Sequence, residues 1–481
     1  MESFLGGSLM ITYFRPYNSK IADPIYKYIE ISSKPTKKGE LTERDLINSP
    51  WLQRLTRIHQ LQSTWWVYPG GEHSRFQHSL GVMYMAGEFA RQLYPSLSKV
   101  CKKYNEDIPS QEFVVETARL AGLFHDVGHG PFGHLFDFMV LKPFYNTNHE
   151  EISQKIIREK YKKKIEKIIR SPKGYFNKDE KIDVEDVCIL LRKPETDEAE
   201  TEKRWVRELR ILFSGLYSAD IMDYLQRDSY YCGTPELGLI DSKRLIADSF
   251  INENGLNLHI DSASSLKQFI TSRIQMYDRV YWHKRGRACD LQIVDILADT
   301  YKLMGFKNPE EDLDNYYNLN DWYLFTTMLS WAESKDKKKR KIGKIWRDLI
   351  NQNLYWHEAF YYTVRFTKTL LPGTRIKSPE EMKEDIRNEL PKHLRHLEIK
   401  VDTPDIDVRP ENPRLSKQKV NIYDDKADRY SVFDFEKLTE EIPIKFMSMR
   451  VFIKESKYIP DLYKAAEKVF TTSYKEQGEN F

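Results

Sequence analysis

Histidine is unevenly distributed in this 481-residue chain, and its clustering is the first sign of chemistry. Seven of the twelve histidines lie between residues 59 and 149, which is less than a fifth of the chain. Imidazole binds divalent metals and transfers protons near neutral pH, so this segment is a candidate catalytic site. The histidines in it are His59, His73, His78, His125, His129, His134 and His149.

Two histidines and two aspartates form a candidate metal set: His78, His125, Asp126 and Asp220. Taken alone, His78 could be a hydrogen-bonded core histidine and the His125-Asp126 pair a chance dipeptide. Asp220 continues an apolar stripe, where an ionised carboxylate costs several kcal/mol unless a cation meets it. One shared ion explains all of them, and the mixed nitrogen and oxygen donors suit iron, manganese, zinc or nickel, with magnesium favouring the oxygens.

Four ligands from three segments leave coordination positions open, as in a catalytic site. An ion held in this way lowers the pKa of bound water and polarises a phosphoryl oxygen. His129, His134 and His149 then remain for phosphate contacts or proton donation, and Glu150 could orient His149. Tyr224 and Asp228 follow Asp220 at intervals of four and are expected to face a substrate pocket. Asp223 and Arg227 are expected to form a surface ion pair.

The elements that must position these residues are mostly helices. Apolar residues follow His78 at +4, +7 and +11, Ala118, Ala121 and His125 follow Val114 at the same spacing, and Leu209, Phe213 and Leu216 lead to Asp220 along one stripe, so three helices are predicted. Alternating residues near 397–401, 406–408 and 447–453 predict strands, followed by a helix from Pro460. The predicted fold is mainly α, with an N-terminal segment 1–20, a helical core 21–330 and a smaller α+β C-terminal lobe 331–481.

Composition excludes several classes of protein. No stretch approaches the roughly 18 apolar residues of a membrane span, and no secretory signal is recognisable, so we expect a cytoplasmic protein without membrane contact. The four cysteines are far apart and indicate buried thiols. The net charge of +3 is too balanced to imply a nucleic-acid partner, so any basic site must be a local cluster. The lysine runs 160–181 and 335–344 and the acidic run 194–204 indicate solvated surfaces, with contact of 335–344 to an anionic effector or a nucleic acid as the alternative.

The spaced motifs resemble one family. The order His78, His125-Asp126 and Asp220 is similar to the signature of HD-domain metal phosphohydrolases, especially the deoxynucleoside triphosphate triphosphohydrolases related to the SAM-and-HD-domain enzyme. The HD region begins within the first two dozen residues, so no SAM domain is expected here. The matching segments are 23–25, 60–61, 68–70, 73–81, 125–132, 149–150, 220–228 and 281–284.

This resemblance implies a role for each matching residue. The metal ligands would be His78, His125, Asp126 and Asp220. The α-phosphate region would be held by Arg75, His129 and His134, with His149, next to Glu150, protonating the leaving 5′-oxygen. The sugar 3′-hydroxyl would meet Gln60, beside Leu61, and Asp228, while Tyr281 would pack against C2′ and exclude a ribose hydroxyl. Further phosphate contacts would come from Tyr224, Arg273 and Lys284.

The implied activity is metal-dependent hydrolysis of dNTPs to a deoxynucleoside and inorganic triphosphate by a homo-oligomer. Ile221 stands where the animal members have a phosphate-binding lysine, and Asn48 and Thr56 depart from their GTP site, so a nucleotide effector stays an open question. One alternative is an HD-type phosphodiesterase or nuclease acting on oligonucleotides. Another is a nucleotide-binding or nucleic-acid-binding regulator with a structural metal.

Overall fold

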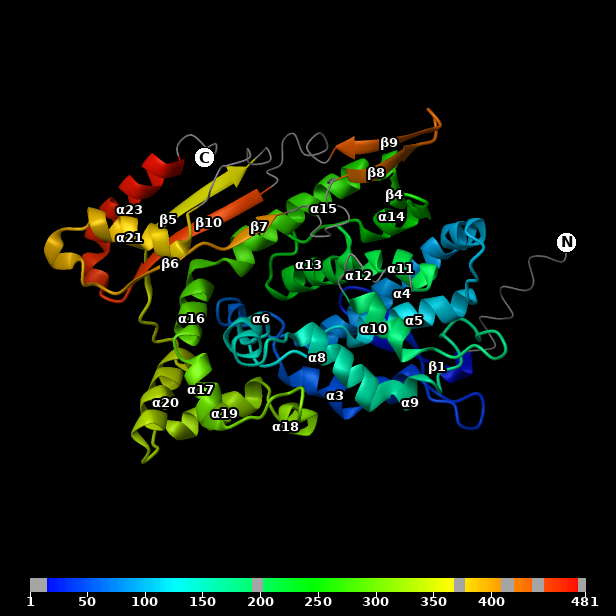
Figure 1. The fold of residues 1–481 in the computed structure, drawn as a ribbon, viewed down its shortest axis with the longest axis horizontal. Coiled ribbons are helices and arrows are strands. Elements are labelled where there is room, and N and C mark those ends of the chain that lie inside the picture. The colour runs from blue at the N-terminus through cyan, green and yellow to red at the C-terminus, as the bar shows by residue number, and fades with distance from the viewer. Residues whose placement is uncertain (1–14, 193–201, 367–376, 408–418, 435–444, 475–481) are drawn as a thin grey trace.

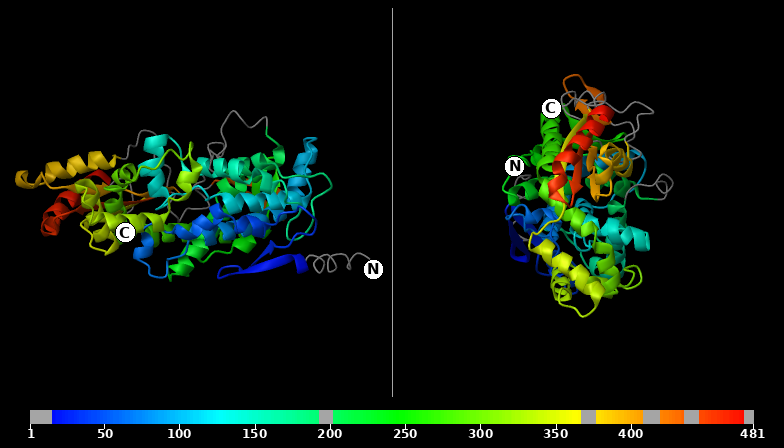
Figure 2. Two further views of the ribbon diagram at one scale, coloured as in Figure 1. Left: turned by 90° about the horizontal axis from the view of Figure 1, so that it is seen from below. Right: turned by 90° about the vertical axis from the view of Figure 1, so that its left-hand side faces the viewer.

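The computed structural model describes residues 15–192, 202–366, 377–407, 419–434 and 445–474 (Figure 1). Within these ranges helices predominate, so the prediction of a mainly α protein with a smaller α+β part is confirmed. The predicted N-terminal segment and acidic run lie largely outside the described residues. Two turned views show an elongated molecule with the C-terminal lobe at one end of the helical body (Figure 2).

The helical body is built from helices of very different length. In chain order they are α2 (Glu43–Ile47), α3 (Pro50–Arg54), α4 (Arg75–Lys103), α5 (Gln111–Phe124), α6 (His134–Phe136), α7 (Lys142–Tyr145), α8 (His149–Ile156), α9 (Lys162–Ile165), α10 (Val184–Leu191), α11 (Arg204–Leu209), α12 (Ile211–Ser214), α13 (Ala219–Tyr231), α14 (Ser242–Ala247), α15 (Ala263–Met276), α16 (Lys284–Val294), α17 (Leu297–Met304), α18 (Leu313–Tyr317), α19 (Asp321–Trp331) and α20 (Lys337–Ile350).

Close packing of α4 against α5 and α13 brings the candidate metal set together. A methyl group on Gly81 of α4 would lie 1.9 Å from the Oδ1 atom of Asp223, and one on Gly122 of α5 would lie 2.7 Å from the main-chain oxygen of Val82. Only glycine permits this approach. The helix α4 begins where the main-chain N–H of Ser74 donates to Gln77 Oε1 (2.8 Å), a capping arrangement that fixes its first turn.

The helix predicted through Leu209 and Asp220 is wrong as a single element. The segment forms α11, α12 and α13, with a break between Ser214 and Ala219. Ser218 begins α13, because its side chain accepts a hydrogen bond from the N–H of Ile221. Asp220 therefore lies in the first turn of a new helix rather than along the apolar stripe.

Three small sheets complete the fold. The strands β1 (Asn18–Asp23) and β2 (Lys27–Ser32) form an antiparallel hairpin. A second sheet has the order β3-β4-β8-β9, from β3 (Ser249–Asn252), β4 (Gly255–His259), β8 (Lys419–Asp424) and β9 (Arg429–Asp434). Its central pair, β4 and β8, is parallel, with Leu258 opposite Ile422, so a C-terminal hairpin lies on the helical body (Figure 1).

The C-terminal lobe has a hydrophobic core of its own. Its sheet has β10 (Lys445–Ile453) between β5 (His357–Phe366) and β6 (Ile399–Asp402), with β7 (Asp405–Asp407) also paired to β10. The helices α21 (Pro379–Glu389) and α23 (Ile459–Tyr474) pack on it and bury Ile386, Met449 and Phe470. The strands predicted near 399 and 447 and the helix after Pro460 are confirmed.

Two predictions from composition can be compared with the structure. All four cysteines are buried and unpaired, as expected for core thiols. Among the described residues, no helix combines the length and the apolar composition that crossing a membrane requires.

Candidate active site

The four candidate metal ligands converge from three helix ends. His78 Nε2 on α4 lies 3.0 Å from Asp220 Oδ1 on α13 and 3.2 Å from His125 Nε2, just after α5. The same nitrogen of His125 lies 3.2 Å from Asp126 Oδ1. The ligand atoms of His78, His125 and Asp220 all lie within 4.8 Å of one another, a spacing that suits one divalent cation, whereas Asp126 lies outside this group and approaches it through His125.

The electrostatics of the cluster also favour a cation. Burial opposes ionisation of Asp126, but the charges of His125 and Arg75 hold its pKa well below the ordinary value. His78 is buried too, yet its hydrogen bonds to Asp220 and Asp223 raise its pKa to about 10. A metal ion would take the place of the proton that these carboxylates attract to the imidazole. The side chain of Asp220 is 36% exposed, so it faces the cavity rather than the core.

The outer nitrogens of both histidines are fixed by neighbouring acceptors. His78 Nδ1 bonds to Asp223 Oδ2 (2.8 Å), and His125 Nδ1 bonds to the main-chain oxygen of Gly122 (2.8 Å). Such contacts orient an imidazole so that its other nitrogen faces a metal. The prediction of a surface pair between Asp223 and Arg227 is wrong, because both side chains are fully buried. Asp223 lies three residues after Asp220 on one helix face, and this spacing could have revealed its role.

Arg75 and His129 lie beside the candidate metal ligands. Arg75 Nη1 lies 2.6 Å from Asp126 Oδ2, and His129 Nε2 lies 3.4 Å from Asp126 Oδ1. Burial and the charge of Arg75 lower the pKa of His129 well below its ordinary value, which favours the neutral imidazole. Arg75 lines the cavity and can present a cation to a phosphate next to the ion, whereas His129 is buried and does not line the cavity.

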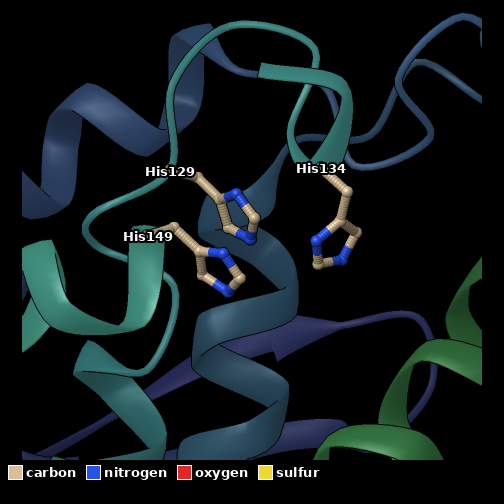
Figure 3. Close-up of side chains that lie close together, drawn as sticks. All are labelled: His129, His134 and His149. Carbon is tan, nitrogen blue, oxygen red and sulfur yellow. The ribbon is translucent and has the colours of Figure 1, made fainter. Parts of the chain in front are cut away.

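Three histidines form a second group, which Figure 3 shows converging from adjacent turns. The rings of His129 and His149 are stacked with centroids 3.7 Å apart, and one nitrogen of each histidine, His134 included, lies within 4.8 Å of the others. Asp137, which the sequence analysis did not assign, accepts a hydrogen bond from His149 Nδ1. His134 is 56% exposed, so this group faces open space.

Both groups open into one cavity of about 380 Å³. On the same lining, Tyr281 donates a hydrogen bond from its hydroxyl to Asp228 Oδ2 (2.7 Å). Burial and the charge of Asp228 raise the pKa of Tyr281 well above its ordinary value, so its hydroxyl stays protonated. The predicted site residues that line the cavity are Gln60, Leu61, Arg75, His78, His125, Asp126, His134, His149, Glu150, Asp220, Tyr224, Asp228 and Tyr281.

Three predicted phosphate contacts do not line this cavity: the buried His129, Arg273 and Lys284. Arg273 is buried beside Tyr224 and Tyr277, and its interactions with these two side chains raise its pKa although burial opposes this. It is not among the cavity-lining residues. Lys284 lines a different cavity of about 490 Å³, together with Arg279, Arg365 and Arg450. The structure therefore does not bring Lys284 to the first cavity.

The chain is similar in sequence to a known domain family and to several known proteins. Residues 75–203 match the family model of the HD domain, a region that contains His78, His125 and Asp126 but not Asp220. The chain is 28% identical to the uncharacterized protein YwfO of Bacillus subtilis, over 70% of this chain and 71% of that protein. It is 27% identical to the deoxynucleoside triphosphate triphosphohydrolase SAMHD1 homolog of Dictyostelium discoideum, and 26% identical to human SAMHD1.

The likeness to SAMHD1 extends beyond the HD domain. The human alignment covers 81% of this chain but 62% of human SAMHD1, and the Dictyostelium alignment covers 65% of this chain and 56% of that protein. A crystal structure of a hypothetical protein from Aquifex aeolicus superposes over 94% of this chain and all of that chain, with a TM-score of 0.64. At 22% identity this likeness concerns the fold. The chain thus contains a region similar to the HD domain and is related in sequence to the SAMHD1 proteins.

Proposed function

We propose that this protein hydrolyses deoxynucleoside triphosphates to a deoxynucleoside and inorganic triphosphate. The observation that carries the proposal is that one cavity is lined by two sets of residues. The first set is the candidate metal ligands His78, His125, Asp126 and Asp220, and the second is the polar side chains of Gln60, Asp228 and Tyr281. The names of the SAMHD1 relatives support the substrate class.

The metal-binding residues would be His78, His125, Asp126 and Asp220, held in place by Asp223 and the Gly122 main chain. A bound divalent ion supplies a water of lowered pKa and polarises a phosphoryl oxygen. Arg75 lies next to Asp126 and lines the cavity, where it would bind the non-bridging oxygens of the α-phosphate, and the buried His129 lies behind Asp126. Preorganised donors of this kind stabilise the charge that develops as water attacks phosphorus.

His149 is the proposed proton donor. Its Nδ1 bonds to Asp137, which leaves Nε2 to face the leaving group. When the bond between the α-phosphorus and O5′ breaks, the proton from Nε2 passes to O5′ and the product is a neutral deoxynucleoside. Burial opposes ionisation of Asp137, but hydrogen bonds from His134 and His149 hold its pKa well below the ordinary value, so it stays charged and stabilises protonated His149.

Gln60, Asp228 and Tyr281, which line the same cavity, would bind the sugar. Gln60 and Asp228 can receive the 3′-hydroxyl, and the ring of Tyr281 would lie against C2′ and exclude a 2′-hydroxyl. Tyr281 is held between Tyr224 and Tyr277, whose ring centroids lie 6.2 and 5.0 Å away, so its position is restricted. A restricted ring can reject ribonucleotides by steric exclusion.

Product identification tests this proposal. The protein is incubated with each dNTP alone and with all four together, with Mn²⁺ or Mg²⁺, and the products are separated by anion exchange. We expect deoxynucleoside and triphosphate, and turnover only in the mixture would indicate a nucleotide effector. Release of pyrophosphate, preference for ribonucleotides, or faster shortening of labelled oligonucleotides would contradict the proposal.

A matched pair of variants links the activity to the metal. His125→Ala should lose both turnover and bound metal, measured by mass spectrometry of the purified protein. His393→Ala removes an exposed histidine from the C-terminal lobe and should retain both. Full turnover by a metal-depleted His125→Ala protein would show that the four-residue set is not the catalytic centre.

A further inference from the structure

His73 is a buried histidine that the proposed reaction does not use. Its side chain is fully buried, and it is not among the residues that line the catalytic cavity. It therefore cannot contact a nucleotide in that cavity. It nevertheless contacts two residues that do line the cavity, Asp228 and Gln60.

The side chain of His73 holds Asp228. His73 Nε2 lies 2.8 Å from Asp228 Oδ1, while the Tyr281 hydroxyl donates to Oδ2 at 2.7 Å. A carboxylate only accepts hydrogen bonds, so Nε2 must carry the proton. With one donor on each oxygen, the carboxylate cannot rotate, and each oxygen keeps a lone pair for a ligand.

The main chain of His73 holds Gln60. The N–H of Gln60 donates to the carbonyl oxygen of His73 (3.0 Å), next to an isolated antiparallel bridge between His59 and Ser74. Gln60 Oε1 is buried but has no hydrogen-bond partner among the described residues. A buried acceptor of this kind costs free energy unless a ligand donates to it, so it points to a hydroxyl or amino group bound there.

The ring of His73 is itself immobilised. It stacks on Tyr231 with centroids 4.5 Å apart and an interplanar angle of 12°, at the end of α13. Its Nδ1 has no partner among the described residues, so the contact with Asp228 is the polar interaction that fixes the ring. One residue thereby ties the segment at Gln60 to the last turns of α13.

We propose that His73 is the positioning residue for recognition of the sugar 3′-hydroxyl: its side chain aligns Asp228 and its main chain aligns Gln60. The inference rests on the proposed function, because it takes a nucleotide sugar as the ligand of Gln60 and Asp228. It predicts that the Nε2–H donor of His73 controls how strongly the protein prefers a nucleotide with a 3′-hydroxyl over one without it.

Three variants of the full chain separate this role from packing. His73→Phe keeps a ring to stack on Tyr231 but has no donor for Asp228, and His73→Leu removes the donor with a different shape in case the first variant does not fold. His73→Gln restores an N–H donor near the Nε2 position. Melting temperature and metal content confirm that each variant is folded and loaded.

The readout is the ratio of kcat/KM for a dNTP to that for its 2′,3′-dideoxy analogue. His73→Phe should lower kcat/KM for the dNTP about 10- to 100-fold, mainly through KM, and change the value for the analogue by less than about 3-fold, because only the dNTP uses the aligned acceptors. His73→Gln should recover most of the ratio. Equal losses for both nucleotides, an unchanged ratio, or a wild type without any preference would overturn the inference.

A binding measurement separates this inference from the proposed function. Calorimetry measures the affinities for dATP and for 2′,3′-dideoxyATP in two proteins: the His125→Ala variant, and the double variant that carries His125→Ala and His73→Phe. If the wild type releases no triphosphate but His73→Phe still removes a preference for dATP, the proposed function fails and the inference stands. If triphosphate is released but the preference survives in His73→Phe, the inference fails alone.

Discussion

Asp223 shows how a residue can serve the site without facing the cavity. It accepts hydrogen bonds from His78 Nδ1, from the hydroxyl of Tyr26 and from the guanidinium of Arg227. Burial opposes its ionisation, but the charge of Arg227 and the hydrogen bond from His78 hold its pKa well below the ordinary value. A permanent negative charge behind His78 strengthens the imidazole as a ligand.

Replacing this charge should weaken metal binding more than it disturbs the fold. Asp223→Asn retains the shape of the side chain, and we expect the apparent metal affinity to fall about 10- to 100-fold because the orienting carboxylate is lost. Competition with a chromophoric chelator measures the affinity. Asp461→Asn, at an exposed position of α23, is the control. Unchanged affinity in Asp223→Asn would mean that His78 needs no carboxylate to orient it.

At the scale of elements, the contact between α4 and α13 determines whether the ligands meet. Gly81 lies against Asp223, and a methyl group at this position would lie 1.9 Å from Oδ1 and 2.5 Å from Arg227 Nη2. Both neighbours are buried charged groups held by each other, so they have no space into which to move. The helices would have to separate, and His78 would move away from Asp220.

Gly81→Ala should therefore lower stability and metal content together. Overpacking of this kind costs about 1–3 kcal/mol, although alanine is the better helix former. Thermal unfolding and metal analysis measure the two effects. Gly286→Ala in α16 is the matched control, because its nearest neighbour would lie 3.6 Å away. A stable, fully metal-loaded Gly81→Ala protein would show that the helices need not approach so closely.

Local patterns predicted some elements well and others badly. The spacing from His78 and from Val114 indicated α4 and α5, because the apolar residues at these positions are buried within single unbroken helices. The same spacing from Leu209 was misleading, because α11 ends at Leu209, α12 ends at Ser214, and a new helix begins before Asp220. The burial of Asp223 and Arg227 depends on Asp23, about 200 residues earlier in the chain, and no helical pattern contains that information.

At the scale of the whole molecule, buried charges make stability depend on pH. Glu116 on α5 is fully buried, and neither of its carboxyl oxygens has a hydrogen-bond partner among the described residues. Arg119, 3.7 Å away, is already engaged by Glu43 at 2.7 Å. Burial and the charge of Glu43 raise the pKa of Glu116 well above its ordinary value.

The raised pKa of Glu116 determines how the stability of the fold changes with pH. The folded protein binds the Glu116 proton more tightly than the unfolded chain does. The stabilisation that comes from this proton is therefore greatest below about pH 4.3, and it decreases as the pH rises toward the raised pKa of Glu116. Glu116→Gln cannot ionise. Its melting temperature, relative to the wild type, should therefore increase from pH 4 to pH 8. A constant difference across this range would show that Glu116 titrates normally.

The distribution of the fold along the chain was only partly predictable. The composition and the alternating strands indicated a helical body with a smaller α+β lobe, which the structure confirms. The core of the helical body, however, includes Ile422 and Phe446 from the far end of the chain. Such long-range pairings depend on the complete tertiary structure, whereas sequence patterns report only local periodicity. The proposed division at residues 20 and 330 remains a prediction.

The parallel pairing of β4 with β8 also means that β4 cannot be fully paired until β8 has been synthesised. Asn257 pairs with Asn421, so one edge of β4 has no partner strand until the ribosome has added another 164 residues. At roughly 5–20 residues per second, the ribosome leaves that strand edge uncovered for about 8 to 33 s, a period in which nascent chains on one messenger could pair with each other. Slow codons or a chaperone acting on this interval would influence the yield of native protein.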